Sequence, residues 1–159
     1  MISALVASVC LIVPSGAVVI DPFRAPICDR CAGNRGLELA LPAGSPVTAG
    51  AEGTVWFAGQ VGGRNYVVLR ATSDPRIRIT YGGIDAIAVQ RGERVARGQR
   101  LGRSIGHLFL GVRLGDRYID PLTVAVDGAT SATAPPDVAA TPRFRVTLGS
   151  AAGRSCASD

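Results

Sequence analysis

The chain has 159 residues, 47% hydrophobic and 18% charged, so it is large and apolar enough for one folded domain and is not wholly disordered. Its formal net charge is +5 and all 17 basic residues are arginines, which favours anionic partners. The arginines are spread from Arg24 to Arg154 without a dense run or interleaved aromatic residues, so a nucleic-acid partner is not expected.

The first twenty residues are almost entirely apolar. Pro14 followed by Ser15, Gly16 and Ala17 is typical of a secretory signal peptide with a small-residue cleavage site, although a positively charged start is missing. A membrane anchor is the alternative, because spanning a bilayer takes about 20 apolar residues. We therefore interpret residues 1–20 as a signal peptide or membrane anchor. The protein is expected to be exported to the cell envelope or outside the cell, or else membrane-anchored, touching a membrane only through an uncleaved N-terminal segment.

Four cysteines occur, at positions 10, 28, 31 and 156. Cys28 and Cys31 form a C-x-x-C motif, which serves in redox sites, metal sites or local disulfides. In an exported protein a structural disulfide is the expected form. The sequence leaves open how Cys28, Cys31 and Cys156 pair.

The middle of the chain is typical of short β-strands separated by glycine-rich turns, with no amphipathic helix. Strands are predicted over residues 54–58, 66–70, 76–81 and 108–114. In the third, Ile77, Ile79 and Tyr81 alternate with polar or charged residues, as in a half-buried strand. Residues 59–65 are predicted to connect two strands of a hairpin. The pattern indicates an all-β domain over residues 21–126.

A weak internal repeat supports this interpretation. Residues 44–50 and 92–98 both match G-x-x-V-x-x-G. Repeated hairpins would place Val47 and Val95 inward between two turns.

From residue 127 the composition changes to alanine, threonine, serine and proline, including Pro135-Pro136. This composition predicts a flexible tail over residues 127–159. We assign no function to the tail.

The run Asn-Arg-Gly-Leu-Glu-Leu-Ala-Leu-Pro-Ala-Gly-Ser-Pro-Val at residues 34–47 resembles the opening of LytM-type (M23 family) peptidase domains, H-x-G-[IV]-D-[LI]-A-x-P-x-G-T-P-V. The likeness continues through residues 53–59 and 91–99 and closes at residues 118–122, in the family's order. This resemblance implies a LytM-like antiparallel β-sheet with an open groove. Members of the family are zinc endopeptidases that cut cell-wall peptide cross-links, or inactive relatives that bind and regulate wall hydrolases.

The resemblance also assigns the family's functional positions. The three zinc ligands, histidine, aspartate and histidine, fall on Asn34, Glu38 and Phe109. The two catalytic histidines fall on His107 and on Gly83.

A catalytic zinc needs three protein ligands and an open position for water. Only Glu38 remains a plausible ligand among the three, and the chain has a single histidine, His107. We therefore expect no zinc, no other cofactor and no catalytic residue. Cys28 and Cys31 could supply sulfur ligands to a non-standard site with Glu38 and His107, which is the alternative.

The groove is expected to bind a ligand through Arg35, Tyr81, His107 and Arg113. Two residues at the groove have simpler alternative roles. His107 could be an ordinary surface histidine, and Glu38 could pair with Arg35 or Arg113. Aromatic residues near the groove are expected to pack in the core rather than to stack on a peptide; these are Trp56, Tyr81 and Phe109.

The sequence thus predicts a non-catalytic LytM-like domain of the cell envelope that binds cell-wall (peptidoglycan) peptide or regulates a wall hydrolase. The alternative is a residual zinc metalloendopeptidase that acts on peptidoglycan cross-links through a non-standard site. A third possibility is a structural envelope module whose binding resides in the tail.

Overall fold

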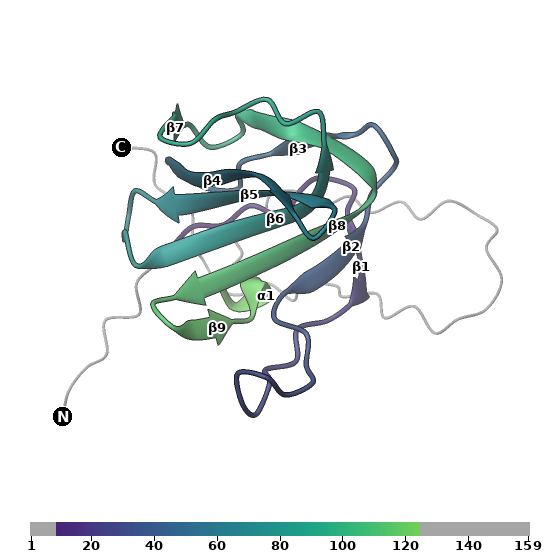
Figure 1. The fold of residues 1–159 in the computed structure, drawn as a ribbon. Helices are drawn as coiled ribbons and strands as arrows, with labels where there is room; N and C mark the ends of the chain where they lie inside the picture. The colour runs from purple at the N-terminus through teal and green to yellow at the C-terminus, as the bar shows by residue number, and fades with distance from the viewer. Residues whose placement is uncertain (1–8, 125–159) are drawn as a thin grey trace, which may run out of the picture.

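The computed structural model describes residues 9–124, which form one antiparallel sheet (Figure 1). The sheet has nine strands in the main order β1-β2-β8-β6-β5-β4-β7, while β3 and β9 pair with β8 outside this path. The strands are β1 (Val18–Asp21), β2 (Leu37–Ala40), β3 (Pro46–Thr48), β4 (Gly53–Val61), β5 (Arg64–Ala71), β6 (Ile77–Asp85), β7 (Arg94–Val95), β8 (Arg100–Leu114) and β9 (Arg117–Ile119). A short helix, α1 (Pro121–Val124), follows β9. The predicted all-β antiparallel fold is confirmed.

Strand β8 is the centre of this sheet. One of its edges pairs in succession with β3, β2 and β9, and the other pairs with β6 along most of its length. With 15 residues it is the longest strand of the described part. The positions of β2, β6 and β9 relative to one another are therefore fixed by hydrogen bonds to a single strand.

Alternation along the strands separates a core face from an open face. Leu37 and Leu39 of β2 are fully buried, as are Leu108 and Leu110 of β8. Because successive side chains point to opposite sides of a sheet, the residues between them face the other way. Glu38 therefore lies on the open face, together with the alternate residues of β8 that begin at His107.

The four predicted strands correspond to β4, β5, β6 and β8, with the third predicted to begin one residue too early, and the hairpin connection was predicted too long. β4 and β5 extend through most of residues 59–65, and the turn consists of Gly62 and Gly63 with φ of 57° and 80°. Two-residue turns that match the sheet twist need positive φ at both positions, which glycine adopts without strain. The inward valines of the repeat are confirmed, since Val47 is 0% and Val95 1% exposed.

The N-terminal segment belongs to the packed domain. Leu11 is fully buried, and the backbone N–H of Ile12 donates to the carbonyl of Gly50 at 2.8 Å. Val19 of β1 pairs with Leu39 of β2. Residues before position 21 thus pack against the sheet. The core would lose Leu11 if the chain were cleaved after Ala17.

Other predictions concern residues outside the described part. The expected tail over residues 127–159, including Cys156, and the first eight residues lie outside it. Within residues 9–124, no helix is long and apolar enough to span a bilayer. Signal cleavage and export stay predictions.

Replacement of Leu11 by alanine tests whether the N-terminal segment stabilises the domain. We expect Leu11→Ala to lower the free energy of unfolding by about 2–5 kcal/mol, as for other buried leucines. Urea denaturation would measure the change. The matched control is Ile27→Ala, at a side chain that is 95% exposed, for which little change is expected. Equal, small effects for both variants would contradict this packing.

Candidate functional site

Asn34 lies at the start of the open face and is held by backbone groups. It is 8% exposed and forms an isolated bridge with Arg24. Its side-chain Nδ2 donates to the carbonyls of Pro22 at 3.0 Å and Asp21 at 3.3 Å, and its Oδ1 accepts from the N–H of Gly36. The amide therefore ties the segment after β1 to the start of β2, with both polar atoms engaged.

Glu38 and His107 face each other from neighbouring strands. Glu38 pairs across β2 and β8 with Phe109, so His107 is its diagonal neighbour, and the His107 Nε2 lies against the Glu38 Oε2. Arg64 Nη2 lies 3.1 Å from the His107 Nδ1. Because a guanidinium can only donate, Nδ1 must accept, which assigns the ring proton to Nε2 and directs it at the carboxylate. Glu38 thus pairs with His107, not with Arg35 or Arg113 as considered from the sequence.

The ring of Phe109 lies over Gly36 and Gly111 on the open face. A Cβ atom at Gly36 would lie 2.7 Å from the Phe109 Cζ, and one at Gly111 would lie 2.9 Å from the Phe109 Cε1. Both distances are shorter than side-chain carbons tolerate, so glycine at these two positions makes room for the ring. Gly36 lies between Asn34 and Glu38 in the chain, and Phe109 fills the space beside it.

Gly83 forms a bulge in β6, where the pairing with β8 shifts register between Gly82 and Ile84. Its φ of 77° is a conformation that favours glycine. A Cβ here would meet the carbonyl oxygen of His107 at 3.0 Å and the Arg64 Nη2 at 3.5 Å. The guanidinium of Arg64 therefore lies beside the position at which the resemblance places a catalytic histidine.

Tyr81 packs in the core, as one of its two predicted roles requires, and so it does not line the groove as the other required. It alternates with Ile77 and Ile79 on the core face of β6 and is fully buried. Its hydroxyl accepts a hydrogen bond of 2.8 Å from the N–H of Gly50. Burial in apolar surroundings raises the pKa of the Tyr81 phenol well above its usual range, an effect that this hydrogen bond offsets only in part.

A cleft of about 430 Å³ runs across the open face. Its lining includes two predicted groove residues, Arg35 and Arg113, but not His107. The full lining is Arg35, Trp56, Val68, Arg78, Thr80, Phe109, Gly111, Val112, Arg113 and Tyr118. The cleft therefore lies beside Glu38 and His107, toward β6, β5 and β4.

Trp56 is part of this cleft, contrary to the expectation that it packs in the core. The pairing of β4 with β5 shifts register between Val55 and Phe57, so Trp56 sits in a bulge and is 40% exposed. The guanidinium of Arg70 lies 3.8 Å from its ring centroid. Strand alternation alone could not predict this orientation, because a bulge breaks the alternation.

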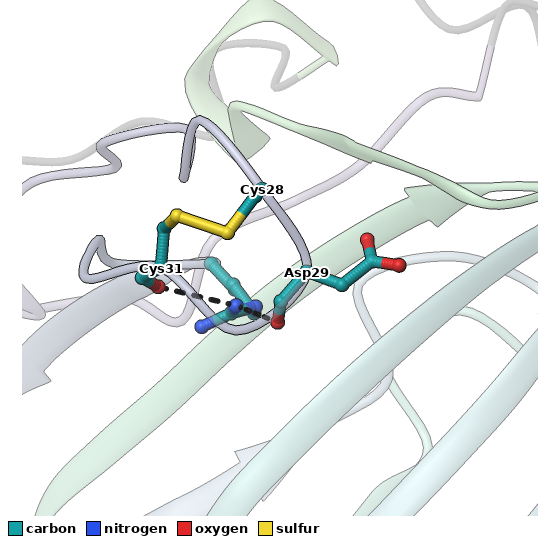
Figure 2. The surroundings of a disulfide bond; sticks show 4 residues. Cys28, Asp29 and Cys31 are labelled. Atoms are coloured by element: carbon teal, nitrogen blue, oxygen red, sulfur yellow. Dashed lines mark hydrogen bonds between the residues drawn. A yellow bond between two sulfur atoms is a disulfide. The ribbon is translucent and has the colours of Figure 1, made fainter.

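A disulfide loop positions Arg35 at the other end of the cleft. Cys28 and Cys31 are joined with Cα atoms 5.0 Å apart, and Figure 2 shows them with Asp29 in the same tight loop. The Arg35 Nη2 donates to the carbonyl of Asp29 at 2.6 Å and lies 3.5 Å from that of Cys31. The disulfide settles the open pairing of Cys28 and Cys31, whose sulfurs are thus unavailable as thiolate ligands. The described residues contain no free cysteine.

The antiparallel sheet has the fold of solved peptidase structures, such as a zinc-containing peptidase of Vibrio cholerae with a TM-score of 0.59 at 23% identity, covering 76% of this chain and 41% of that one. Residues 32–121 match the model of Peptidase family M23, and this chain belongs to that family. The resemblance to LytM-type domains is confirmed.

This chain matches only part of the length of each relative. An uncharacterized metalloprotease of Haemophilus influenzae is 33% identical over 128 residues, 72% of this chain and 26% of that protein. The peptidoglycan DD-endopeptidase ShyA of Vibrio cholerae is 35% identical over 91 residues, 53% of this chain and 20% of that protein. The structure of Helicobacter pylori Csd3 has a TM-score of 0.63 at 26% identity, covering 74% of this chain and 33% of that one. The chain thus spans about a quarter or less of the curated relatives it matches.

Family M23 peptidases normally depend on zinc, and the residues at the ligand positions here fit zinc poorly. The Asn34 amide is engaged with backbone groups, and Phe109 has no ligating atom. Glu38 and His107 remain, and they bind each other. Within residues 9–124, no group of three or more histidine, cysteine, aspartate or glutamate residues could hold a metal ion. A catalytic zinc needs three such ligands.

The buried hydroxyl of Tyr81 predicts a loss of stability at alkaline pH. In the unfolded chain a tyrosine ionises near pH 10, whereas the raised pKa keeps the native phenol protonated. Above about pH 10 the unfolded state binds fewer protons than the native state, so stability falls as pH rises. We expect urea unfolding to show a shallower fall between pH 9 and 11 for Tyr81→Phe than for the wild type. Identical slopes would contradict the assignment.

A double-mutant cycle tests the contact between Glu38 and His107. Unfolding of Glu38→Ala, His107→Ala and the double variant should give a coupling free energy of about 0.5 kcal/mol or more, because the two side chains touch and are partly buried. The ion pair between Arg113 and the fully exposed Asp116 is the control, for which a smaller coupling is expected. Additive effects of the two single substitutions would contradict the contact.

Proposed function

We propose that this M23 domain is non-catalytic and that it binds cell-wall peptide or regulates a wall hydrolase through its open face. One observation carries the proposal: two of the three family ligand positions hold Asn34, whose amide is bound to backbone groups, and Phe109, whose ring packs on glycines. Asn34 could turn toward a metal only by giving up these hydrogen bonds, and Phe109 has no atom that could bind one. Restoring three ligands would therefore take substitutions, not a rotation of existing side chains.

Its site of action would be the cell envelope, with the protein exported. The family and the peptidoglycan endopeptidase among its relatives support this assignment. The packed N-terminal segment adds a condition: any processing that keeps the fold intact must leave Leu11 in place.

The second candidate function is residual zinc endopeptidase activity on peptidoglycan. It is favoured by the carboxylate of Glu38 and the imidazole of His107, which lie together on the open face. Both groups would have to leave each other to bind a metal, and Arg64 would then place a positive charge beside it. Such repulsion weighs against this candidate.

Metal content and wall lysis separate the two candidates. The purified full chain, dialysed and then incubated with zinc, is expected to retain no stoichiometric zinc by elemental analysis and to clear no wall material in a zymogram. The triple variant Asn34→His, Glu38→Asp, Phe109→His restores the family ligands and is expected to gain zinc. Stoichiometric zinc together with lysis in the wild type would overturn the proposal.

Binding is tested by sedimentation with purified peptidoglycan and by adding the protein to an active M23 endopeptidase. We expect the full chain to pellet with the wall or to change the rate of hydrolysis, and Arg35→Ala to weaken that effect. Deletion of residues 127–159 should leave it intact. If the effect were lost on deletion of residues 127–159 and unchanged by Arg35→Ala, the open face would not be the binding site.

A further inference from the structure

Three arginines stand directly opposite one another on the open face. Arg70 of β5 pairs in register with Arg78 of β6, and Arg78 pairs in register with Arg113 of β8. Residues paired in this way point to the same face with Cβ atoms about 5 Å apart. We call this set the arginine row. Tyr118 of β9 is the next partner, opposite Arg113.

Like charges placed directly opposite one another destabilise a sheet. Neutralisation by neighbouring acids is small here. Arg70 and Arg78 form no ion pair within residues 9–124, and the partner of Arg113, Asp116, has a fully exposed side chain. Arg78 and Arg113 line the cleft, Arg70 lies just outside the lining beside Trp56, and the lining contains no acidic residue. Pairing with acidic residues of the described part therefore does not explain three guanidinium groups at these positions.

Aromatic rings bound the arginine row at both ends. The Arg113 guanidinium lies 5.2 Å from the Tyr118 ring centroid, which Arg35 also approaches at 5.4 Å. At the other end Arg70 stacks on Trp56 at 3.8 Å, and Arg78 lies 5.5 Å from the same ring. Stacking on a ring holds a guanidinium in place while its edge stays available for planar, two-pronged bonding to a carboxylate.

We propose that the arginine row binds an extended peptide that carries at least two carboxylates. The cleft of about 430 Å³ is far larger than a single inorganic anion needs and falls in the usual range for organic ligands. The three arginines project from positions whose Cβ atoms are about 5 Å apart, so together they present a line of donors rather than a point. Carboxylates on alternate residues of an extended chain lie about 7 Å apart, which arginine side chains can span. This proposal names the ligand chemistry of the face to which the proposed function assigns binding, and in that respect it rests on that function.

The single tryptophan of the chain makes the test direct. Trp56 borders the arginine row, so its fluorescence reports on ligand binding there. The probe is an acetylated, amidated peptide, Ala-Glu-Ala-Glu-Ala, and its matched control is Ala-Gln-Ala-Gln-Ala. We expect saturable fluorescence changes with the first peptide, weakened by added salt, and none with the second. Equal binding of the two peptides would overturn the proposal.

Arg78→Gln removes the middle of the arginine row. Arg97→Gln, at an exposed arginine outside the cleft lining, makes the same change in net charge. We expect Arg78→Gln to weaken binding of the glutamate peptide at least about tenfold and Arg97→Gln to leave it nearly unchanged. Arg78→Gln should also raise the urea midpoint, because it relieves repulsion. An unchanged affinity with a lower midpoint would show a structural role and contradict the proposal.

Two further probes define the ligand class. Tripolyphosphate or a short single-stranded DNA that binds as tightly as the glutamate peptide would mean a general anion site and would contradict the carboxylate assignment. Peptide binding that depends on Arg78, without any effect on wall material, would support the arginine row and contradict the proposed function. Wall binding that is unchanged by Arg78→Gln would support the proposed function and contradict the role of the arginine row.

Discussion

Strand β8 pairs along both of its edges, and this pairing determines where the site residues of β2, β6, β8 and β9 lie. Hydrogen bonds along one edge fix β3, β2 and β9, and those along the other fix β6. A slip of one residue in any of these registers would exchange the two faces of that strand. It would bring leucines to the surface and turn His107, Phe109 and Arg113 inward. The fully buried Leu108 and Leu110 oppose such a slip, so the core specifies the geometry of the open face.

Much of this fold could be predicted from the sequence, since alternation and turn residues are local signals. Ile77 and Ile79 indicated a half-buried strand, and glycine patterns indicated turns around inward valines. The same alternation places Tyr81 on the side of the two isoleucines, which agrees with its predicted core packing and not with a place in the groove. What alternation could not show was the packing of Leu11, because an apolar N-terminal segment that packs in a core has the same composition as a secretory signal.

The sequence predicted which residues occupy the functional positions of the family, but it predicted only some of the contacts that these residues make. Residue identities revealed that Asn34 and Phe109 replace family ligands. They could not reveal that Glu38 pairs with His107, because that contact depends on which residues of β2 and β8 lie diagonally opposite. The arginine row was invisible for the same reason. Its members come from three different strands, and only the registers of two strand pairs bring them into line. The bulge at Trp56 has no distinct sequence signal.

These contacts divide the open face into two parts with different electrostatic character. Beside β2, the carboxylate of Glu38 is bound to His107 Nε2, and Arg64 lies against the other ring nitrogen, Nδ1. The hydrogen-bonding groups of this part therefore bind one another. Across β8, β6 and β5, guanidinium groups face one another with no carboxylate in the cleft lining. Because Glu38 is engaged by His107, it cannot also neutralise the arginines. The half of the face that has no carboxylate in its cleft lining is therefore the half from which binding energy would come, and it lies next to the metal-ligand positions of the family rather than on them.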